Sequence, residues 1–239
     1  MTIKPWIIDI LIPARDEEAA LPHLIAEIDR SLVRRILVVD NGSQDRTSKI
    51  AIEAGCEVIC EPKPGYGGAC LAGIKYLQNH RPPDILVFLD GDRSDHPRFL
   101  PDLVAPIKNH GCQLVIGSRT LGNAEHGSLT FTQKFGNRLA TALIYLFWGK
   151  KFTDLGPFRA IHWPALMAMQ MNDTTFGWTV EMQIKAAMLE MKYTEVPVDY
   201  RNRIGVSKIS GTVSGVVKAG YKILLTVFKY KFWPPAKKR

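Results

Sequence analysis

The sequence contains no uninterrupted run of about twenty apolar residues, so it predicts no transmembrane helix. Its first residues lack the apolar core and the cleavage site of a signal peptide. The four cysteines have no zinc-binding spacing, which predicts reduced thiols packed among helices and strands. Together these absences predict a cytosolic location.

Two common phosphate-binding signatures are also absent. The glycine-rich segment that begins at Gly65 is neither a Walker A loop nor a dinucleotide fingerprint, which argues against a P-loop NTPase and against a dehydrogenase. The first predicted strand is followed by Asp16-Glu17-Glu18 instead of a glycine-rich basic loop. That acidic segment argues against a nucleotidyltransferase that makes nucleotide-sugars.

Acidic residues are missing from the last part of the chain. Tyr200–Arg239 contains ten lysines and arginines and no acid, whereas residues 1–199 contain 21 cations against all 23 acids. The net charge of +8 therefore belongs to the C-terminal end. This asymmetry predicts a polyanionic partner, either a nucleic acid or an anionic membrane surface.

Short apolar segments predict β-strands at residues 6–13, 35–40, 56–61, 85–89 and 114–117. Helical patterns lie between them: one runs from the acidic segment to about residue 33, one starts near residue 45, one ends near residue 80, and one spans 97–110. This alternation predicts an α/β fold with a doubly wound, mainly parallel sheet and helices on both faces. We expect one domain over residues 1–211 and an amphipathic helical elaboration over residues 212–239.

Carboxylates follow three of the predicted strands. Glu17 follows the first, Asp40 the second, and Asp90, Asp92 and Asp95 the fourth. Because parallel strands end at one edge of a sheet, these acids should gather in one crevice. A single strand-end acid is usually a helix cap, but a set of them with an adjacent pair favours a site for a nucleotide and Mg²⁺ or Mn²⁺.

The chemistry of that crevice suits a sugar nucleotide. A carboxylate such as Asp40 can accept the ring N–H of uracil or the paired N–H groups of guanine, and Glu17 could accept a ribose hydroxyl. The metal would neutralise the departing diphosphate while the sugar is transferred.

Several motifs resemble, in order and spacing, the family 2 glycosyltransferases of GT-A fold. They are Pro13-Ala-Arg-Asp-Glu-Glu, Val38-Val-Asp-Asn-Gly-Ser-Gln-Asp, the Gly65–Ala69 loop and Asp90-Gly-Asp. The second half resembles the branch that contains dolichyl-phosphate mannose and glucose synthases, through Gly117-Ser-Arg, Asp154-Leu-Gly-Pro-Phe-Arg-Ala, Gly177-Trp-Thr-Val-Glu-Met, Val196-Pro-Val, Arg201, Arg203 and Ser207-Lys208. The resemblance extends to about Gly211.

The resemblance implies roles for particular residues. It implies donor binding by Pro13, Glu17, Asp40, Gly65, Asp90 and Asp92, and metal binding by Asp90, Asp92 and Asp95. It implies acceptor-phosphate contacts by Arg119, Arg201, Arg203 and Lys208, and catalytic contacts by Asp92, Glu181 and Arg119. Two positions depart from the family pattern: Asn41 replaces a second acid, and the loop after Asp92 leaves the third metal ligand open between Asp95 and solvent.

The acceptor and the membrane are predicted from the basic end. A phosphate monoester is already ionised and needs no general base, only cations such as Arg201, Arg203 and Lys208 to position it. Asp154 and Asp173 are the possible bases for a hydroxyl acceptor. Over residues 213–232 the lysines share one stripe and the apolar side chains spread over the other side, a pattern typical of an interfacial helix and equally of a core helix.

The sequence therefore predicts an inverting glycosyltransferase at the cytoplasmic face of a membrane. It would move a hexose from a UDP-glucose or GDP-mannose type donor to a polyprenyl or dolichyl phosphate. One alternative keeps the donor and uses a hydroxyl acceptor in a glycolipid or cell-envelope glycan. Another is a non-catalytic nucleic-acid-binding protein, which the acidic crevice and the absence of a nucleic-acid module disfavour, so we expect no nucleic-acid partner.

Overall fold

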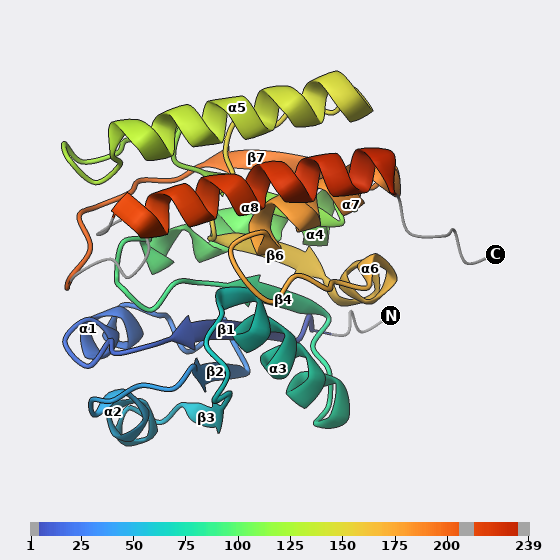
Figure 1. The fold of residues 1–239 in the computed structure, drawn as a ribbon. Coiled ribbons are helices and arrows are strands. Elements are labelled where there is room, and N and C mark those ends of the chain that lie inside the picture. The colour runs from blue at the N-terminus through green and yellow to red at the C-terminus, as the bar shows by residue number, and fades with distance from the viewer. Residues whose placement is uncertain (1–4, 206–212, 234–239) are drawn as a thin grey trace.

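The structure is a computed structural model that describes residues 5–205 and 213–233 (Figure 1). The described strands form one seven-stranded sheet in the order β3-β2-β1-β4-β6-β5-β7. They are β1 (Ile8–Ala14), β2 (Arg35–Asp40), β3 (Glu57–Cys60), β4 (Ile85–Phe88), β5 (Leu114–Ser118), β6 (Arg159–His162) and β7 (Tyr193–Pro197). Only β6 among them runs antiparallel to its neighbours, so the predicted mainly parallel α/β sheet is confirmed.

Helices cover both faces of the sheet and enclose two apolar cores. One face carries α1 (Leu21–Ala26), α2 (Thr47–Glu53) and α4 (Leu100–His110), which follows a short 3₁₀ turn at Pro97–Phe99. The other carries α3 (Tyr66–Asn79), α5 (Phe131–Trp148), α6 (Trp163–Met169), α7 (Trp178–Met188) and α8 (Val213–Phe232). Because helices lie on both sides, the central strands are apolar without alternation.

Pro13 lies in the central strand β1, where a missing backbone N–H would normally cost a ladder bond. The carbonyl of Leu11 accepts from Leu89 on the β4 side, so Pro13, two residues on, also faces that side. Strand β4 ends at Phe88, which pairs with Leu11. The proline therefore stands beyond the end of its neighbour and leaves no strand acceptor without a donor.

The helix predicted from the acidic segment to residue 33 is wrong over most of its length, because only Leu21–Ala26 is helical. The backbone N–H groups of Asp16, Glu17 and Glu18 donate instead to side chains of the 43–47 loop. Asp16 also has a positive φ of 51°. Tertiary contacts thus override the local helical pattern.

The C-terminal helix α8 packs on the same face of the sheet as α5 and α7 rather than standing apart. It contacts α5 and α7, and its Val227 and Tyr230 are buried in the core beneath them. Ile223 and Val227 belong to the apolar side that we expected to face lipid, and both face the protein. For these residues the core-helix alternative holds, and the division at residues 211 and 212 stays a prediction. Within the described ranges, no helix combines the length and apolar character that crossing a bilayer requires.

Candidate active site

The ends of β1, β2 and β4 open at the same edge of the sheet. Ala14 pairs with Asp40, so β1 and β2 end level, whereas β4 ends three residues earlier, at Phe88 opposite Leu11. A Cβ built on Gly91 would lie 3.5 Å from Cγ of Glu17, which brings the turn after β4 against the acidic segment after β1. The turn that carries Asp90 and Asp92 therefore lies against the segment that carries Glu17, and the gathering of Asp40 with them stays a prediction.

Asp92 is buried at the centre of this edge. Its Oδ1 accepts from the backbone N–H of Ser94 at 2.9 Å and from the Ser94 hydroxyl at 2.5 Å. Its Oδ2 accepts from Nη2 of Arg203, and its carbonyl accepts from the backbone of Ile204. The structure thus joins a predicted metal ligand to a predicted phosphate contact, in a direct ion pair.

Two neighbouring carboxylates have buried oxygens without hydrogen-bond partners. They are Oδ1 of Asp90 and both oxygens of Asp95, whose side chain is fully buried. Burial and the charge of Asp92 raise the pKa of Asp90 to about 7. Burial and the charges of Asp90 and Asp92 raise the pKa of Asp95 well above its usual range. Orphaned carboxylate oxygens of this kind are what a divalent cation satisfies.

The predicted three-ligand metal set is not assembled in the described part of the chain, where no three His, Cys, Asp or Glu side chains group around a common point. Asp90, Asp92 and Asp95 therefore fit a different arrangement. Mg²⁺ and Mn²⁺ sites in nucleotide enzymes often use one or two carboxylates, and substrate phosphates and water complete the coordination. The carboxylates of Asp90, Asp92 and Asp95 are compatible with that arrangement.

The raised pKa of Asp90 predicts a pH-dependent stability in the absence of divalent ions. The folded protein holds this proton up to about pH 7, whereas the unfolded chain releases it near its ordinary pKa of 3.8. The free energy of unfolding should therefore fall as the pH rises from about 4 to about 7. Urea denaturation at several pH values with a chelator measures this, and Asp90→Asn should flatten the profile. An identical profile in both proteins would contradict the assignment to Asp90.

Arg119 reaches the same edge from the end of β5, and one edge of its guanidinium is bound by Asp154. Its Nε and Nη2 each donate to this carboxylate at 2.7 Å, and its backbone N–H donates at 2.8 Å. Its guanidinium also lies 5.0 Å from the centre of the Tyr200 ring. Burial alone would lower the pKa of Arg119, but the charge and hydrogen bonds of Asp154 outweigh burial, so the pKa is raised overall. Asp154, which the sequence offered as a possible general base, is thus held in an ion pair with Arg119.

The side chains of Arg201 and Glu181 make buried contacts within the protein instead of lining an open site. Arg201 is buried and ion-pairs with Glu27 at 2.6 Å, while it also donates to carbonyls of Arg93 and Asp95 in the loop after Asp92. Glu181 on α7 accepts from the hydroxyl of Tyr230 on α8 at 2.5 Å. It also accepts from the backbone of residues 172 and 173 and ion-pairs with Lys185. Lys208 lies outside the described residues.

The expected base-binding residue Asp40 has both carboxylate oxygens occupied by its own loop. Oδ1 accepts from the backbone N–H of Ser43 at 2.8 Å, and Oδ2 accepts from the Ser48 hydroxyl. Each oxygen keeps a further lone pair that a nucleoside N–H could use. The hydrogen bonds fix the orientation of the carboxylate before any ligand arrives.

Asn41 departs from the family pattern for a structural reason. Its Nδ2 donates to the carbonyls of Glu61 and Lys63, and its Oδ1 accepts from the backbone of Gly65. An aspartate could not make the two donations. Gly65 in turn allows a close approach, because a Cβ there would lie 2.3 Å from the carbonyl oxygen of Thr174. The glycine-rich loop is therefore shaped by backbone packing.

Sequence reasoning missed two polar side chains behind the acids. Tyr66 has a buried hydroxyl without a hydrogen-bond partner, and burial together with the charge of Asp90 raises its pKa. Arg159 is fully buried and donates only to backbone carbonyls, and burial lowers its pKa to about 10. Arg159 was visible as the arginine of the motif at Asp154, but its burial was not.

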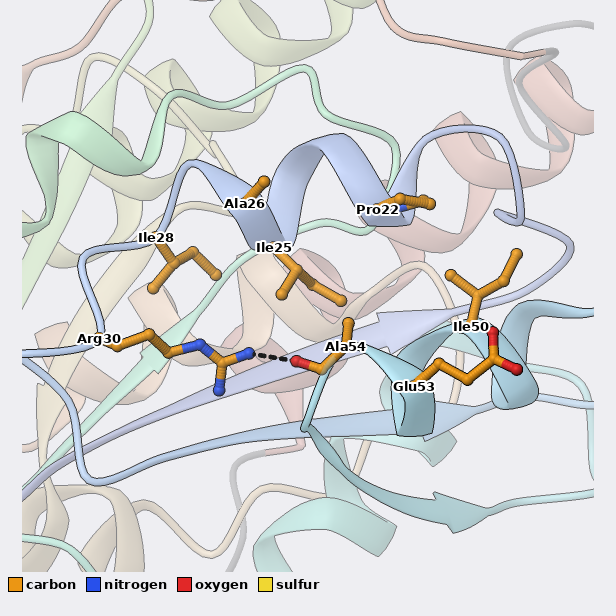
Figure 2. Close-up of a pocket in the computed structure, with 8 residues that line it drawn as sticks. All are labelled: Pro22, Ile25, Ala26, Ile28, Arg30, Ile50, Glu53 and Ala54. Atoms are coloured by element: carbon orange, nitrogen blue, oxygen red, sulfur yellow. Dashed lines mark hydrogen bonds between the residues drawn. The ribbon is translucent and has the colours of Figure 1, made fainter.

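A hollow of about 520 Å³ lies away from these acids, between α1 and α2 (Figure 2). Apolar side chains such as Ile25, Ile28 and Ile50 line most of it, and Arg30 at its rim donates to the carbonyl of Ala54 at 2.7 Å. It contains none of the strand-end carboxylates. We therefore place the candidate active site at the carboxyl edge of the sheet.

Comparison with known proteins identifies the class. Residues 9–167 match the family described as Glycosyl transferase family 2. The chain belongs to this family, so it is a glycosyltransferase, and the non-catalytic alternative is set aside. The predicted family, enzyme class and GT-A fold are confirmed.

Individual relatives agree with the family assignment. The chain is 32% identical over 213 residues to an uncharacterized glycosyltransferase of Mycobacterium tuberculosis, Rv0539, which covers 89% of this chain and 94% of that protein. It is 27% identical over 200 residues to the glycosyltransferase AglJ of Haloferax volcanii, which covers 83% of this chain and 64% of that protein.

Solved structures share the fold. Glucosyl-3-phosphoglycerate synthase from Mycobacterium tuberculosis, in complex with Mn²⁺, UDP and glucosyl-3-phosphoglycerate, is 22% identical with a TM-score of 0.74. The alignment covers 97% of this chain and 82% of that one. The same enzyme in complex with Mg²⁺ and UDP has a TM-score of 0.76, with 97% and 81% covered.

Proposed function

We propose that this chain transfers a hexose from a UDP-sugar to the phosphate of a polyprenyl-type lipid, with Mg²⁺ or Mn²⁺ as cofactor. The observation that carries the proposal is the group of buried, unpartnered oxygens on Asp90 and Asp95 beside Asp92 at the carboxyl edge. The Mn²⁺ and UDP in a structural relative favour uridine over guanosine in the donor. A GDP-sugar is the second donor to test, alongside the UDP-sugar.

In the reaction, the bond between the anomeric carbon and the diphosphate breaks while an acceptor oxygen attacks from the opposite side. Asp92 and Asp90 would hold the divalent ion, which would neutralise the charge of the departing diphosphate. Asp40 is oriented to receive an N–H of the base. Arg203, which ion-pairs with Asp92, would donate hydrogen bonds to the diphosphate oxygens.

A phosphate acceptor is supported by the state of the two possible bases. Asp154 is committed to Arg119. Asp173 accepts from the backbone of Thr175 and Gly177 and ion-pairs with Lys222 at 3.0 Å. A hydroxyl acceptor requires a base to remove its proton, whereas an ionised phosphate does not. In this proposal residues 1–211 carry catalysis, and residues 212–239 contact an anionic membrane at its cytoplasmic face.

A second candidate acceptor comes from a structural relative whose complex contains phosphoglyceric acid. It would be a small, water-soluble phosphorylated hydroxyl compound. An assay with radiolabelled UDP-glucose or GDP-mannose, Mn²⁺ and either polyprenyl phosphate or phosphoglyceric acid separates the two. We expect label in the organic phase with polyprenyl phosphate. Label transferred only to an aqueous product would contradict the lipid acceptor.

A further inference from the structure

Helix α5 exposes an unusually large apolar surface. Of its 18 residues only Ala140, Thr141 and Ile144 are buried. On the opposite side a row of exposed large side chains recurs every three or four residues, apart from one longer step: Phe131, Phe135, Leu139 and Leu146. Phe131 is 84% exposed and Leu146 is 72% exposed. A row of this length exceeds the scattered apolar residues that are normal on a protein surface.

Helix α8 carries a second exposed row. Its inner side packs on the protein through Thr226, Val227 and Tyr230. Its outer side exposes Tyr221, Leu225, Phe228 and Phe232, at steps of four, three and four residues, and is followed by the 74% exposed Trp233. Of this outer row, the sequence pattern had assigned only Phe228 to the apolar side that faces lipid.

The two helices that carry these rows pack on each other. Helices α5 and α8 lie side by side at one border of the molecule (Figure 1). Phe228 of the α8 row meets Phe147 of α5 with ring centroids 5.9 Å apart, and Phe232 stacks on Phe228 at 6.2 Å. Lys231 lies 5.3 Å from the centre of the Phe147 ring. We name the exposed apolar rows of both helices the two-helix face.

The two helices of this face carry charge of a single sign. Helices α5 and α8 contain six lysines and arginines and no acid. Lys134 and Arg138 on α5 are exposed, as are Lys229 and Lys231 on α8. A second copy of this chain would bring like charges together, which disfavours a dimer through this face. Exposed aromatics flanked by cations are typical of a surface that enters the interface of an anionic bilayer.

We propose that the two-helix face docks onto the surface of an anionic lipid bilayer, with α5 contributing as much as α8. Both helices would lie in the plane of the interface, with their aromatic rows among the acyl chains and their cations at the headgroups.

This placement also brings the bilayer to the active site. Asn137 on α5 donates to the carbonyl of Thr153 at 2.9 Å and accepts from the backbone of Leu155 at 2.8 Å. It thereby fastens α5 to the loop that carries Asp154, the partner of Arg119. A lipid-borne acceptor would reach the sheet edge from this side, a consequence that rests on the proposed function.

Vesicle co-sedimentation of the full chain tests the docking. We expect it to pellet with vesicles of phosphatidylcholine and phosphatidylglycerol, and less with phosphatidylcholine alone or in high salt. Combining Phe131→Ser, Phe135→Ser and Leu146→Ser should weaken binding by about tenfold or more. The matched control combines Leu32→Ser, Ile52→Ser and Leu189→Ser, which are exposed apolar positions outside both rows and should bind like the unchanged chain.

Two further measurements keep the result decisive. Calorimetric titration with UDP and Mn²⁺ should give the same affinity for both triple variants, so a failed donor site is distinguished from a failed membrane surface. The proposal is overturned if the unchanged chain does not bind anionic vesicles, or if the α5 variant binds them as well as the control variant does. Light scattering that finds a dimer which the α5 substitutions dissociate would assign the face to a second copy and overturn it as well.

Discussion

Asp92→Asn is expected to lower the rate of sugar transfer by about 100- to 1000-fold, because the side chain would no longer supply the negative charge that holds a divalent ion at the diphosphate. The amide keeps the size of the carboxylate and one oxygen that can accept from Ser94. The fold should therefore persist. Initial rates of transfer from UDP-glucose at several Mn²⁺ concentrations measure the effect.

The control for this prediction is Asp102→Asn, an exposed acid in the first turn of α4. It removes the same charge away from the sheet edge and should leave the rate within about twofold. Thermal unfolding of both variants checks that neither is misfolded. If Asp92→Asn transfers sugar at the unchanged rate, the proposed ion site at Asp92 is refuted.

Asp154→Ala should destabilise the protein by about 3–5 kcal/mol, because it leaves the guanidinium of Arg119 buried without its partner. The Arg119 side chain is 13% exposed and Asp154 is 2% exposed, so water can replace little of the lost interaction. Urea denaturation measures the change in the free energy of unfolding.

The double variant Arg119→Met with Asp154→Leu distinguishes a structural pair from a catalytic one. Apolar side chains of similar volume can replace a buried ion pair at little cost, so we expect most of the lost stability to return. Since Asp154 binds the Nε–Nη2 edge of the guanidinium, we also expect the folded double variant to keep at least about a tenth of the transfer rate. A stable double variant without activity would show that Arg119 acts on substrate after all.

The first five strands and the acids that follow them could be predicted from the sequence because both are local signals, whereas β6 and β7 were not predicted. A continuous apolar run such as 85–89 is typical of a strand buried on both faces of a mainly parallel sheet, and the carboxylates then fall at its end. The helix predicted from the acidic segment at Asp16 was wrong over most of its length. The local pattern contains no information about the 43–47 loop, whose side chains accept from the backbone N–H groups of this segment.

The contacts of the predicted site residues depend on partners that are distant in the sequence. Asp92 and Arg203 are 111 residues apart, and no spacing rule indicates that they pair. Glu181 looked like a site residue by motif, but its buried contact with Tyr230 exists only because α8 folds back onto α7. Helix α5 was missed altogether, because apolar side chains occur around its whole circumference and indicate no single buried side.

The sequence by itself determined the α/β class, the family and the edge of the sheet where acids gather, since each depends on the order of residues along a strand and the turn after it. Only the tertiary structure decided which charges neutralise one another and which side of α8 meets solvent. Those outcomes depend on what lies opposite each side chain, and a one-dimensional periodicity contains no information about that neighbour.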